Sequence, residues 1–157
     1  MKIVLDTNVF ISGIFFHGAP YDILNAWRHS RIHLVVSPDI LNEYRRVTTQ
    51  LMKTFPGVDP EPFLDLLMMK ASMIESPCLP EQVSTDKADD MFLSCALASK
   101  TKIVVSGDKA LLKTSGYRCI VVISPRNFVN RYLEKKNLTS HCTRPKSLRF
   151  LAGEFYH

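Results

Sequence analysis

The sequence predicts an α/β fold of three layers, in which helices cover both faces of a central parallel sheet. Short β-branched apolar runs, such as those at 3–5, 32–36 and 103–105, alternate with amphipathic helical segments. That alternation is typical of a parallel sheet whose strands are buried on both faces. The chain has 157 residues, of which 46% are hydrophobic and 22% charged, which suits one ordinary globular domain.

The first half of the chain predicts two strands and three helices. The β-branched run at 2–6 ends in a carboxylate and is expected to be the first strand, and 32–36 the second. Gly18 and Pro20 open a helix through Trp27. Ser37 is a hydroxyl N-cap followed by proline and an acid, a strong start for a helix to about residue 51. Asp59-Pro60-Glu61 opens a further helix that reaches Lys70.

The second half predicts two more strands and three helices. Thr85 or Asp86 caps a helix over 87–100, and the strand at 103–106 follows it. The turn at Gly107-Asp108 leads into a short helix, and the next strand is expected at 119–123. Ser124-Pro125 repeats the cap-plus-proline pattern for a helix to about residue 133.

Four acidic residues occupy positions where such a sheet binds ligands, namely at the ends of strands and in the first or second turn of the helices that follow. Asp6 ends the first strand, and Asp108 follows the strand at 103–106 across one glycine. Glu43 shares a helix face with Ile40 and Val47, and Asp89 with Leu93 and Ala96. Both acids should therefore lie on or beside the buried face, and no Lys or Arg lies on those faces near them.

Buried carboxylates without a cationic partner repel one another and raise one another's pKa. A divalent hard cation such as Mg²⁺ or Mn²⁺ removes both problems. Each acid also has a structural interpretation, because a lone aspartate after a strand is more often a helix cap. Asp86 is expected to be an N-cap, and Asp90 could stabilise a helix N-terminus through the macrodipole. The prediction of a metal site therefore rests on the set of four acids and not on any one of them.

The motifs around these acids resemble the PIN domain, and more closely the VapC-like ribonuclease toxins of prokaryotic toxin–antitoxin systems. The resemblance covers about residues 1–133 and keeps the family's order of motifs, which are Ile3-Val4-Leu5-Asp6-Thr7-Asn8-Val9, Ser37 through Glu43 to Val47, Asp86-Lys87-Ala88-Asp89-Asp90-Met91-Phe92-Leu93 and Val104-Val105-Ser106-Gly107-Asp108. It implies a three-layer sheet related to the flap-endonuclease fold and an endoribonuclease that depends on Mg²⁺ or Mn²⁺.

Carried over residue by residue, the resemblance makes Asp6, Glu43, Asp89 and Asp108 the catalytic acids. Asp6, Asp89 and Asp108 would hold the metal, with Glu43 and Asp90 as further candidate ligands because the third acid is ambiguous between Asp89 and Asp90. The polar side chains that would support these acids are Thr7, Asn8 and Ser106. The resemblance also implies an RNA substrate, a small antitoxin partner and a homodimer.

The basic charge of the chain is concentrated near its C-terminus. The net charge is +5, and residues 131–149 hold six basic residues against one acid. We expect a nuclease domain over 1–136 and a basic and apolar extension over 137–157 packed on it. A solvated tail and a phosphate-binding surface are equally good interpretations of this charge, and the candidate RNA contacts are Lys135, Lys136, Arg144 and Lys146.

Other classes of protein are less well supported. The cysteines form no C-x-x-C pair and the histidines no H-E-x-x-H motif, so neither zinc nor a disulfide framework is indicated. No apolar run approaches the ~18 residues of a membrane span, and we expect a cytoplasmic protein without membrane contact. Two alternatives stay open: a PIN-like RNA- or protein-binding module without catalysis, and a haloacid-dehalogenase-like phosphatase. The phosphatase family places a second aspartate where this chain has Asn8.

Overall fold

The five strands of the central sheet all run in the same direction. A computed structural model, which describes residues 1–134, orders them β3–β2–β1–β4–β5. The strands are β1 (Lys2–Leu5), β2 (His33–Val36), β3 (Ser72–Met73), β4 (Ile103–Val105) and β5 (Val121–Ile123). In the central pairings Lys2 lies opposite His33, and Val4 opposite Val104. The predicted parallel α/β sheet is confirmed.

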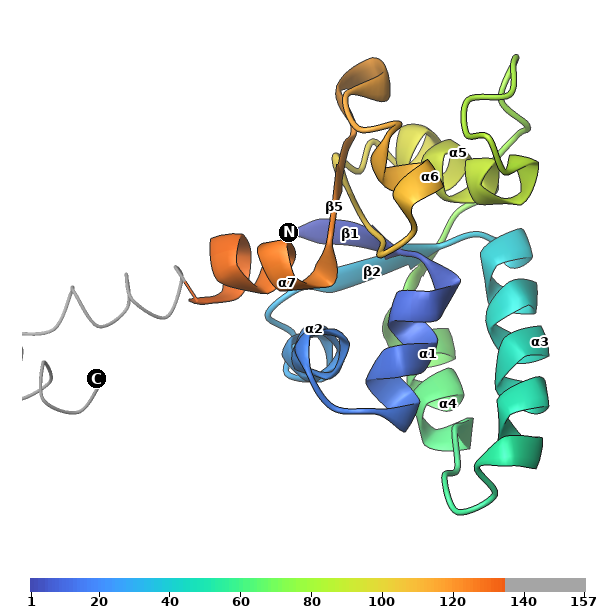
Figure 1. The fold of residues 1–157 in the computed structure, drawn as a ribbon, viewed down its shortest axis with the longest axis vertical. Helices are drawn as coiled ribbons and strands as arrows, with labels where there is room; N and C mark the ends of the chain where they lie inside the picture. Colours follow the sequence, from blue (N-terminus) through green and yellow to red (C-terminus); the bar gives the residue numbers. More distant parts are fainter. Residues whose placement is uncertain (135–157) are drawn as a thin grey trace, which may run out of the picture.

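Helices cover the sheet on both sides, with α5 and α6 on one and α1, α2 and α4 on the other (Figure 1). The α-helices are α1 (Thr7–Phe15), α2 (Ala19–Arg28), α3 (Pro38–Thr54), α4 (Glu61–Lys70), α5 (Asp90–Ala98), α6 (Lys109–Leu112) and α7 (Pro125–Phe128). Two 3₁₀ turns, η1 (Lys87–Asp89) and η2 (Tyr117–Cys119), and one π-helical segment, η3 (Val129–Glu134), complete the described chain. None of the helices within residues 1–134 is long and apolar enough to cross a bilayer.

Helix α1, strand β3 and the turn η2 were not predicted, and two predicted helices are divided, since the one expected after Ser124 consists of α7 and η3. Helix α1 directly follows β1, but its residues are buried nearly all round, so its sequence lacks the polar face that identifies a helix. Strand β3 has only two residues, both exposed. The helix expected over 87–100 begins as the 3₁₀ turn η1 and becomes α-helical only at Asp90. The extension over 137–157 and its candidate RNA contacts Lys135, Lys136, Arg144 and Lys146 lie outside the described residues.

The predicted caps set where the helices begin. Ser37 Oγ accepts a hydrogen bond from the Ile40 amide at 3.3 Å, and Ser124 Oγ accepts one from the Asn127 amide at 3.3 Å. Each cap satisfies a backbone N–H group that would otherwise lack a partner at the helix start. Since Ser37 directly follows β2, this cap fixes the start of α3 beside the carboxyl ends of the strands (Figure 1).

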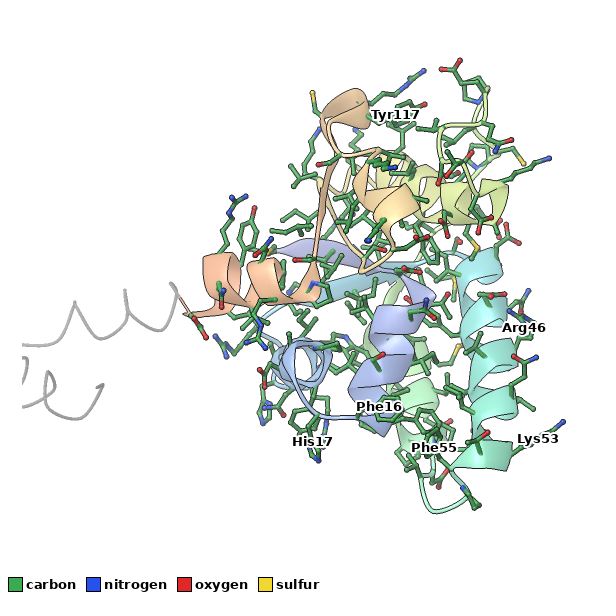
Figure 2. The ribbon with its side chains drawn as sticks, in the orientation of Figure 1. Phe16, His17, Arg46, Lys53, Phe55 and Tyr117 are labelled. Atoms are coloured by element: carbon green, nitrogen blue, oxygen red, sulfur yellow. The ribbon has the colours of Figure 1, made fainter. Side chains whose placement is uncertain are left out.

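An aromatic cluster joins three helices beneath the sheet. The Phe10 ring stacks on Tyr44 with centroids 4.2 Å apart and meets Trp27 edge to face at 6.5 Å. Tyr44 is fully buried, and its hydroxyl donates a hydrogen bond to the carbonyl oxygen of Leu5 at 2.6 Å. This bond ties α3 to the last residue of β1. A second cluster lies at the far end of α1, where Phe16 packs edge to face on Phe55 at 5.4 Å (Figure 2).

Helices α1 and α2 approach each other most closely at Gly13. A Cβ atom at this position would lie 2.6 Å from Leu24 Cδ1 and 2.8 Å from the carbonyl oxygen of Pro20. The helix propensity of alanine exceeds that of glycine by about 1 kcal/mol, but overpacking a tight core costs about 1–3 kcal/mol. We therefore expect Gly13→Ala to lower the free energy of unfolding, measured by urea denaturation.

The matched control for this prediction is Gly57→Ala. A Cβ atom at Gly57 would meet nothing within 4 Å, and the residue does not need the left-handed backbone conformation. Gly57→Ala should be neutral or slightly stabilising. A Gly13→Ala protein as stable as the Gly57→Ala protein would contradict the close approach of the two helices.

Candidate active site

Three of the four predicted acids lie at the carboxyl edge of the sheet. Asp6 follows β1 and is 4% exposed, while Asp108 follows the neighbouring strand β4. Asp89 is 9% exposed and ends η1, directly before α5, which packs on β1 and β4. Asp6 starts α1 through its backbone carbonyl, which accepts from the amides of Val9 and Phe10, and its carboxylate is not used as a cap.

Ser106 connects two of these acids. Its side chain is fully buried, and its Oγ donates a hydrogen bond to Asp6 Oδ2 at 2.7 Å. The same Oγ accepts a hydrogen bond from the Asp108 amide at 3.0 Å. Asp108 in turn caps α6, since its Oδ1 accepts from the Ala110 amide at 3.1 Å. Asp108 therefore caps a helix and also belongs to the acidic cluster, the two roles that the sequence left open for it.

The three aspartates raise one another's pKa. Burial raises the pKa of Asp6, the hydrogen bond from Ser106 opposes this rise, and the charge of Asp108 adds to it. The pKa of Asp89 is raised to about 8, first by burial, then by a hydrogen bond and the charge of Asp108, and further by the charges of Asp6 and Asp86. A shared hydrogen bond between two carboxyl groups requires a proton on one of them, so near neutral pH Asp89 holds a proton that an isolated aspartate would have lost.

The donor chemistry of this cluster fits a divalent hard cation. Asp89 Oδ2 is buried and has no hydrogen-bond partner within the described residues. The three carboxyl groups form no salt bridge within the described residues, and in their charged form they are ligands of the kind that Mg²⁺ and Mn²⁺ accept. Within residues 1–134, no three His, Cys, Asp or Glu side chains stand close enough together to hold a metal ion. Asp89 and Asp108 would have to exchange their mutual hydrogen bond for the cation.

The predicted supporting side chains differ in their surroundings. Ser106 bonds with both Asp6 and Asp108, whereas Thr7 is buried with an Oγ1 atom that has no hydrogen-bond partner in the described chain. Asn8 is exposed, and its backbone amide, like that of Thr7, lowers the pKa of Asp6. The start of α1 therefore presents two backbone amides to the first acid, which favours its charged form.

Glu43 lies apart from the other three acids. The expectation that it lacks a cationic partner is wrong, because Arg46 lies one turn further along α3 and holds both of its carboxylate oxygens. Arg46 Nη2 is 2.6 Å from Glu43 Oε1, and Nε is 3.1 Å from Oε2. The pair lowers the pKa of Glu43, whose side chain is 31% exposed. Helix spacing placed Glu43 beside the buried face but did not reveal that Arg46 reaches back to it.

The neighbouring acids of η1 have separate partners. The Asp90 carboxylate accepts hydrogen bonds from the amides of Val83 at 3.0 Å and Ser84 at 2.7 Å, which holds the preceding loop. Asp86 Oδ1 accepts from the Ala88 amide at 3.0 Å and is the predicted N-cap. Of the two adjacent candidates for the third acid, Asp89 is the one that the charges of Asp6 and Asp108 act on.

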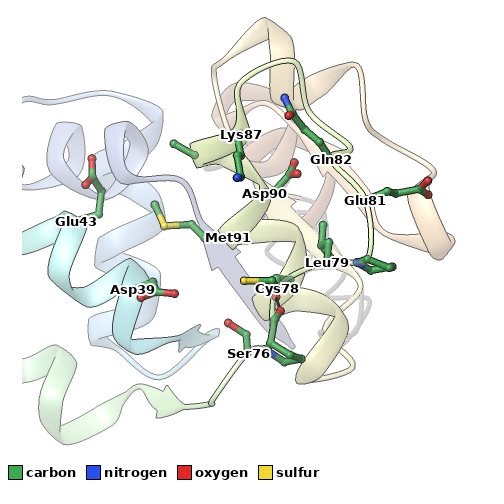
Figure 3. Close-up of a pocket in the computed structure, with 14 residues that line it drawn as sticks. Asp39, Glu43, Ser76, Cys78, Leu79, Glu81, Gln82, Lys87, Asp90 and Met91 are labelled. Atoms are coloured by element: carbon green, nitrogen blue, oxygen red, sulfur yellow. Dashed lines mark hydrogen bonds between the residues drawn. The ribbon is translucent and has the colours of Figure 1, made fainter.

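A pocket of about 770 Å³ lies beside η1, the turn that ends at Asp89, and the sequence did not predict it. Ala88 and Asp90, the two neighbours of Asp89, line it, whereas Asp6, Asp89 and Asp108 do not. The pocket lies between the start of α3, the segment 76–82 and the turn η1 with α5 (Figure 3). The segment 76–82 has no hydrophobic period, and its two prolines mark it only as a loop.

Removal of the Ser106 hydroxyl tests the link between the acids. Ser106→Ala should raise the pKa of Asp6, because the hydrogen bond from Ser106 favours the carboxylate. The free energy of unfolding should fall by about 1–3 kcal/mol, since a buried carboxylate and the Asp108 amide lose their partner. Carboxyl ¹³C shifts followed through a pH titration measure the first effect, and urea denaturation the second.

Ser99→Ala is the control, because it removes a part-buried hydroxyl at the C-terminal end of α5, away from Asp89 at its start. It should leave the titration of Asp6 unchanged. An Asp6 pKa that is the same in Ser106→Ala as in the wild type would show that Ser106 does not support this acid.

Comparisons with known proteins agree with this architecture. The family model described as PIN domain matches residues 2–110, which include all four predicted acids. An uncharacterized protein of Methanocaldococcus jannaschii, MJ1680, is 30% identical over 149 residues, which cover 93% of this chain and 88% of the relative. The name of that relative states no activity, so the similarity does not distinguish the toxin subgroup from other members.

Proposed function

The chain belongs to the PIN domain family, whose members are generally nucleases, and from this premise we propose that it is a divalent-metal-dependent endoribonuclease. The observation that carries the proposal is the convergence of Asp6, Asp89 and Asp108 at the carboxyl edge of the sheet, where the pKa of Asp89 reaches about 8. The haloacid-dehalogenase-like alternative is excluded by the family match.

In this proposal Asp6, Asp89 and Asp108 hold Mg²⁺ or Mn²⁺. Such a cation lowers the pKa of water and offsets the negative charge that develops on phosphate oxygens during hydrolysis. The hydrogen bond from Ser106 fixes one oxygen of Asp6, and the cap on the Ala110 amide fixes one oxygen of Asp108, so both carboxyl groups would be held in place for a cation. Asp89 gives up its proton when the cation binds, because a carboxylate binds a cation only in its charged form.

Glu43 has a different role in the proposal. Glu43 keeps its negative charge, but Arg46 binds both of its carboxylate oxygens. Glu43 therefore lies at the rim of the proposed site and is not one of the main metal ligands. Asp90 supports the loop before η1 through two backbone amides and stays a candidate ligand only if these bonds are released. Neither a histidine nor a lysine is required as a general base.

The narrower features of the proposal rest on the family resemblance alone. They are the choice of RNA over DNA, the role as a toxin, a small antitoxin partner and a homodimer, whereas the cytoplasmic location is proposed from the sequence pattern. The alternative of a PIN-like binding module without catalysis predicts the same fold but no cleavage. The complete set of acids favours the enzyme over this alternative.

Cleavage of a mixed pool of structured and single-stranded RNA tests the proposal. Wild type and Asp6→Asn are compared with Mg²⁺, Mn²⁺ or EDTA. We expect cleavage by the wild type with a divalent cation, none in EDTA, and a loss of at least about 100-fold in Asp6→Asn, since even residues that only support ligands cost 10–100-fold. Cleavage that persists in EDTA or in Asp6→Asn would contradict the metal site, and RNA binding without cleavage would favour the binding module.

A further inference from the structure

The pocket next to the acidic cluster is built differently from the cluster itself. Its apolar lining includes Pro77, Leu79, Pro80 and Met91, and its charged lining consists of four carboxylates and the Lys87 ammonium. Figure 3 shows the Cys78 sulfur and the Asp39 carboxylate pointing toward each other across the pocket. A flat, partly apolar group with polar edges, such as a nucleobase, suits such a lining.

The wall of this pocket is held at both ends. The Ser94 hydroxyl on α5 donates a hydrogen bond to the Pro77 carbonyl oxygen, and Asp90 accepts from the amides of Val83 and Ser84. These bonds anchor both ends of the loop that forms this wall before any ligand arrives. A preformed pocket loses less conformational entropy on binding than a loop that must first be ordered.

The position of the pocket relates it to the proposed reaction. Lys87 and Ala88 line it, and both belong to η1, the turn that ends at Asp89. Lys87 is exposed and forms no salt bridge within residues 1–134. A nucleotide whose phosphate lies at the acidic cluster would have its base within reach of this pocket, and the Lys87 ammonium could contact the backbone phosphate beside it.

The charges of the lining favour one group of bases. Arg46 binds the Glu43 carboxylate, and two backbone amides bind that of Asp90. The exposed carboxylates of Asp39 and Glu81 form no ion pair or hydrogen bond among the described residues. Figure 3 shows the Glu81 carboxylate pointing away from the pocket and that of Asp39 pointing into it. A carboxylate accepts hydrogen bonds from the exocyclic amino groups of cytosine, adenine and guanine. Uracil presents a carbonyl oxygen at the equivalent edge, which a carboxylate repels.

We propose that this pocket binds one unstacked base of an RNA strand next to the scissile phosphate, and that Asp39 selects bases with an exocyclic amino group. The proposal rests on the proposed nuclease function for the identity of the strand. It commits to a single-stranded substrate, because a base in a duplex cannot leave its stack without cost.

Alkylation of Cys78 in the full-length protein tests the proposal without any cleavage. Cys78 is an exposed free thiol in the pocket, Cys119 is an exposed free thiol elsewhere, and burial raises the pKa of Cys95 to about 12, which makes it unreactive. The rate at each site is measured by peptide mass spectrometry with iodoacetamide, in EDTA, with hexamers of rC, rA or rU. We expect rC and rA to slow alkylation of Cys78 about fivefold or more at saturation, with Cys119 unchanged.

The base preference provides the second measurement. Half-maximal protection should require about tenfold more rU than rC, the discrimination expected of one well-placed hydrogen-bond pair. Asp39→Asn should remove most of this preference. Asp22→Asn is the matched control, because Asp22 is the exposed first-turn acid of α2, as Asp39 is of α3. It should leave the preference intact.

The outcomes separate this proposal from the nuclease proposal. Protection of Cys78 in EDTA, together with absence of cleavage in every metal, would support the base pocket and overturn the nuclease. Cleavage without protection of Cys78, or protection by rU equal to that by rC, would overturn the base pocket and leave the nuclease standing. Absence of protection by all three hexamers would also overturn it.

Discussion

Replacing Asp89 with asparagine is expected to abolish RNA cleavage and at the same time to stabilise the protein in the absence of metal at pH 8. Cleavage should fall by at least about 100-fold, since the change removes one of three proposed ligands. Stability should rise because the asparagine amide can donate to Asp108 at any pH, whereas the Asp89 carboxyl must keep a proton to do so. The opposite signs distinguish a functional acid from a structural one.

Thermal unfolding in EDTA and the RNA cleavage assay measure the two effects. Asp22→Asn removes the same negative charge from an exposed position and should leave both cleavage and the melting temperature nearly unchanged. Asp90→Asn is a second comparison and should be destabilising by about 1–3 kcal/mol, because the buried end of the loop depends on its two carboxylate oxygens. Lower stability of Asp89→Asn than of the wild type at pH 8 would contradict the repulsion described for this site.

The metal-free protein is expected to lose stability as the pH rises from about 4 to about 8. The folded-state pKa of Asp89 is about 8, against an ordinary value of 3.8. Between these two values the unfolded chain has released the proton while the folded chain retains it, so the folded state binds more protons. The free energy of unfolding then falls with rising pH, and the loss is complete above pH 8. The raised pKa of Asp6 acts in the same direction.

A divalent cation should reverse this trend. Because the cation replaces a proton at Asp89, its affinity should rise with pH up to about 8. At a concentration about 100-fold above its Kd, the cation would stabilise the fold by about 2.7 kcal/mol, or roughly 5–10 °C in melting temperature. Differential scanning fluorimetry at pH 5.5 and 8 with and without Mn²⁺ gives this result directly. A Mn²⁺ shift of equal size at both pH values would argue against a proton held at Asp89.

The sequence was sufficient to predict the sheet and most helices because their signals are local. The hydroxyl-proline starts at Ser37 and Ser124 contain the whole cap within a few residues, and both helices begin where expected. Helix α1 gave no such signal, since tertiary burial of nearly every face removed its amphipathic pattern. The two residues of β3 gain their strand conformation only by pairing with Val35 and Val36.

The site was predictable to the extent that topology determines it. Asp6 and Asp108 lie close together because β1 and β4 are neighbours and both strands end at the same edge. The sequence could not show that Ser106 joins them, nor that Asp89 rather than Asp90 faces them, because both depend on side-chain directions within a tight turn. The pairing of Glu43 with Arg46 depends on the same kind of detail, as the arginine could equally have extended into solvent.

Binding of Mn²⁺, followed by the electron paramagnetic resonance signal of the free ion, tests the central claim most directly. The protein is titrated at pH 8 as wild type, Asp6→Asn, Asp89→Asn and Asp22→Asn. The three-aspartate site predicts saturable binding in the wild type and in Asp22→Asn, and affinity weakened by at least about tenfold in the other two. Binding of equal strength in Asp6→Asn and Asp89→Asn, or no saturable binding by the wild type, would contradict it.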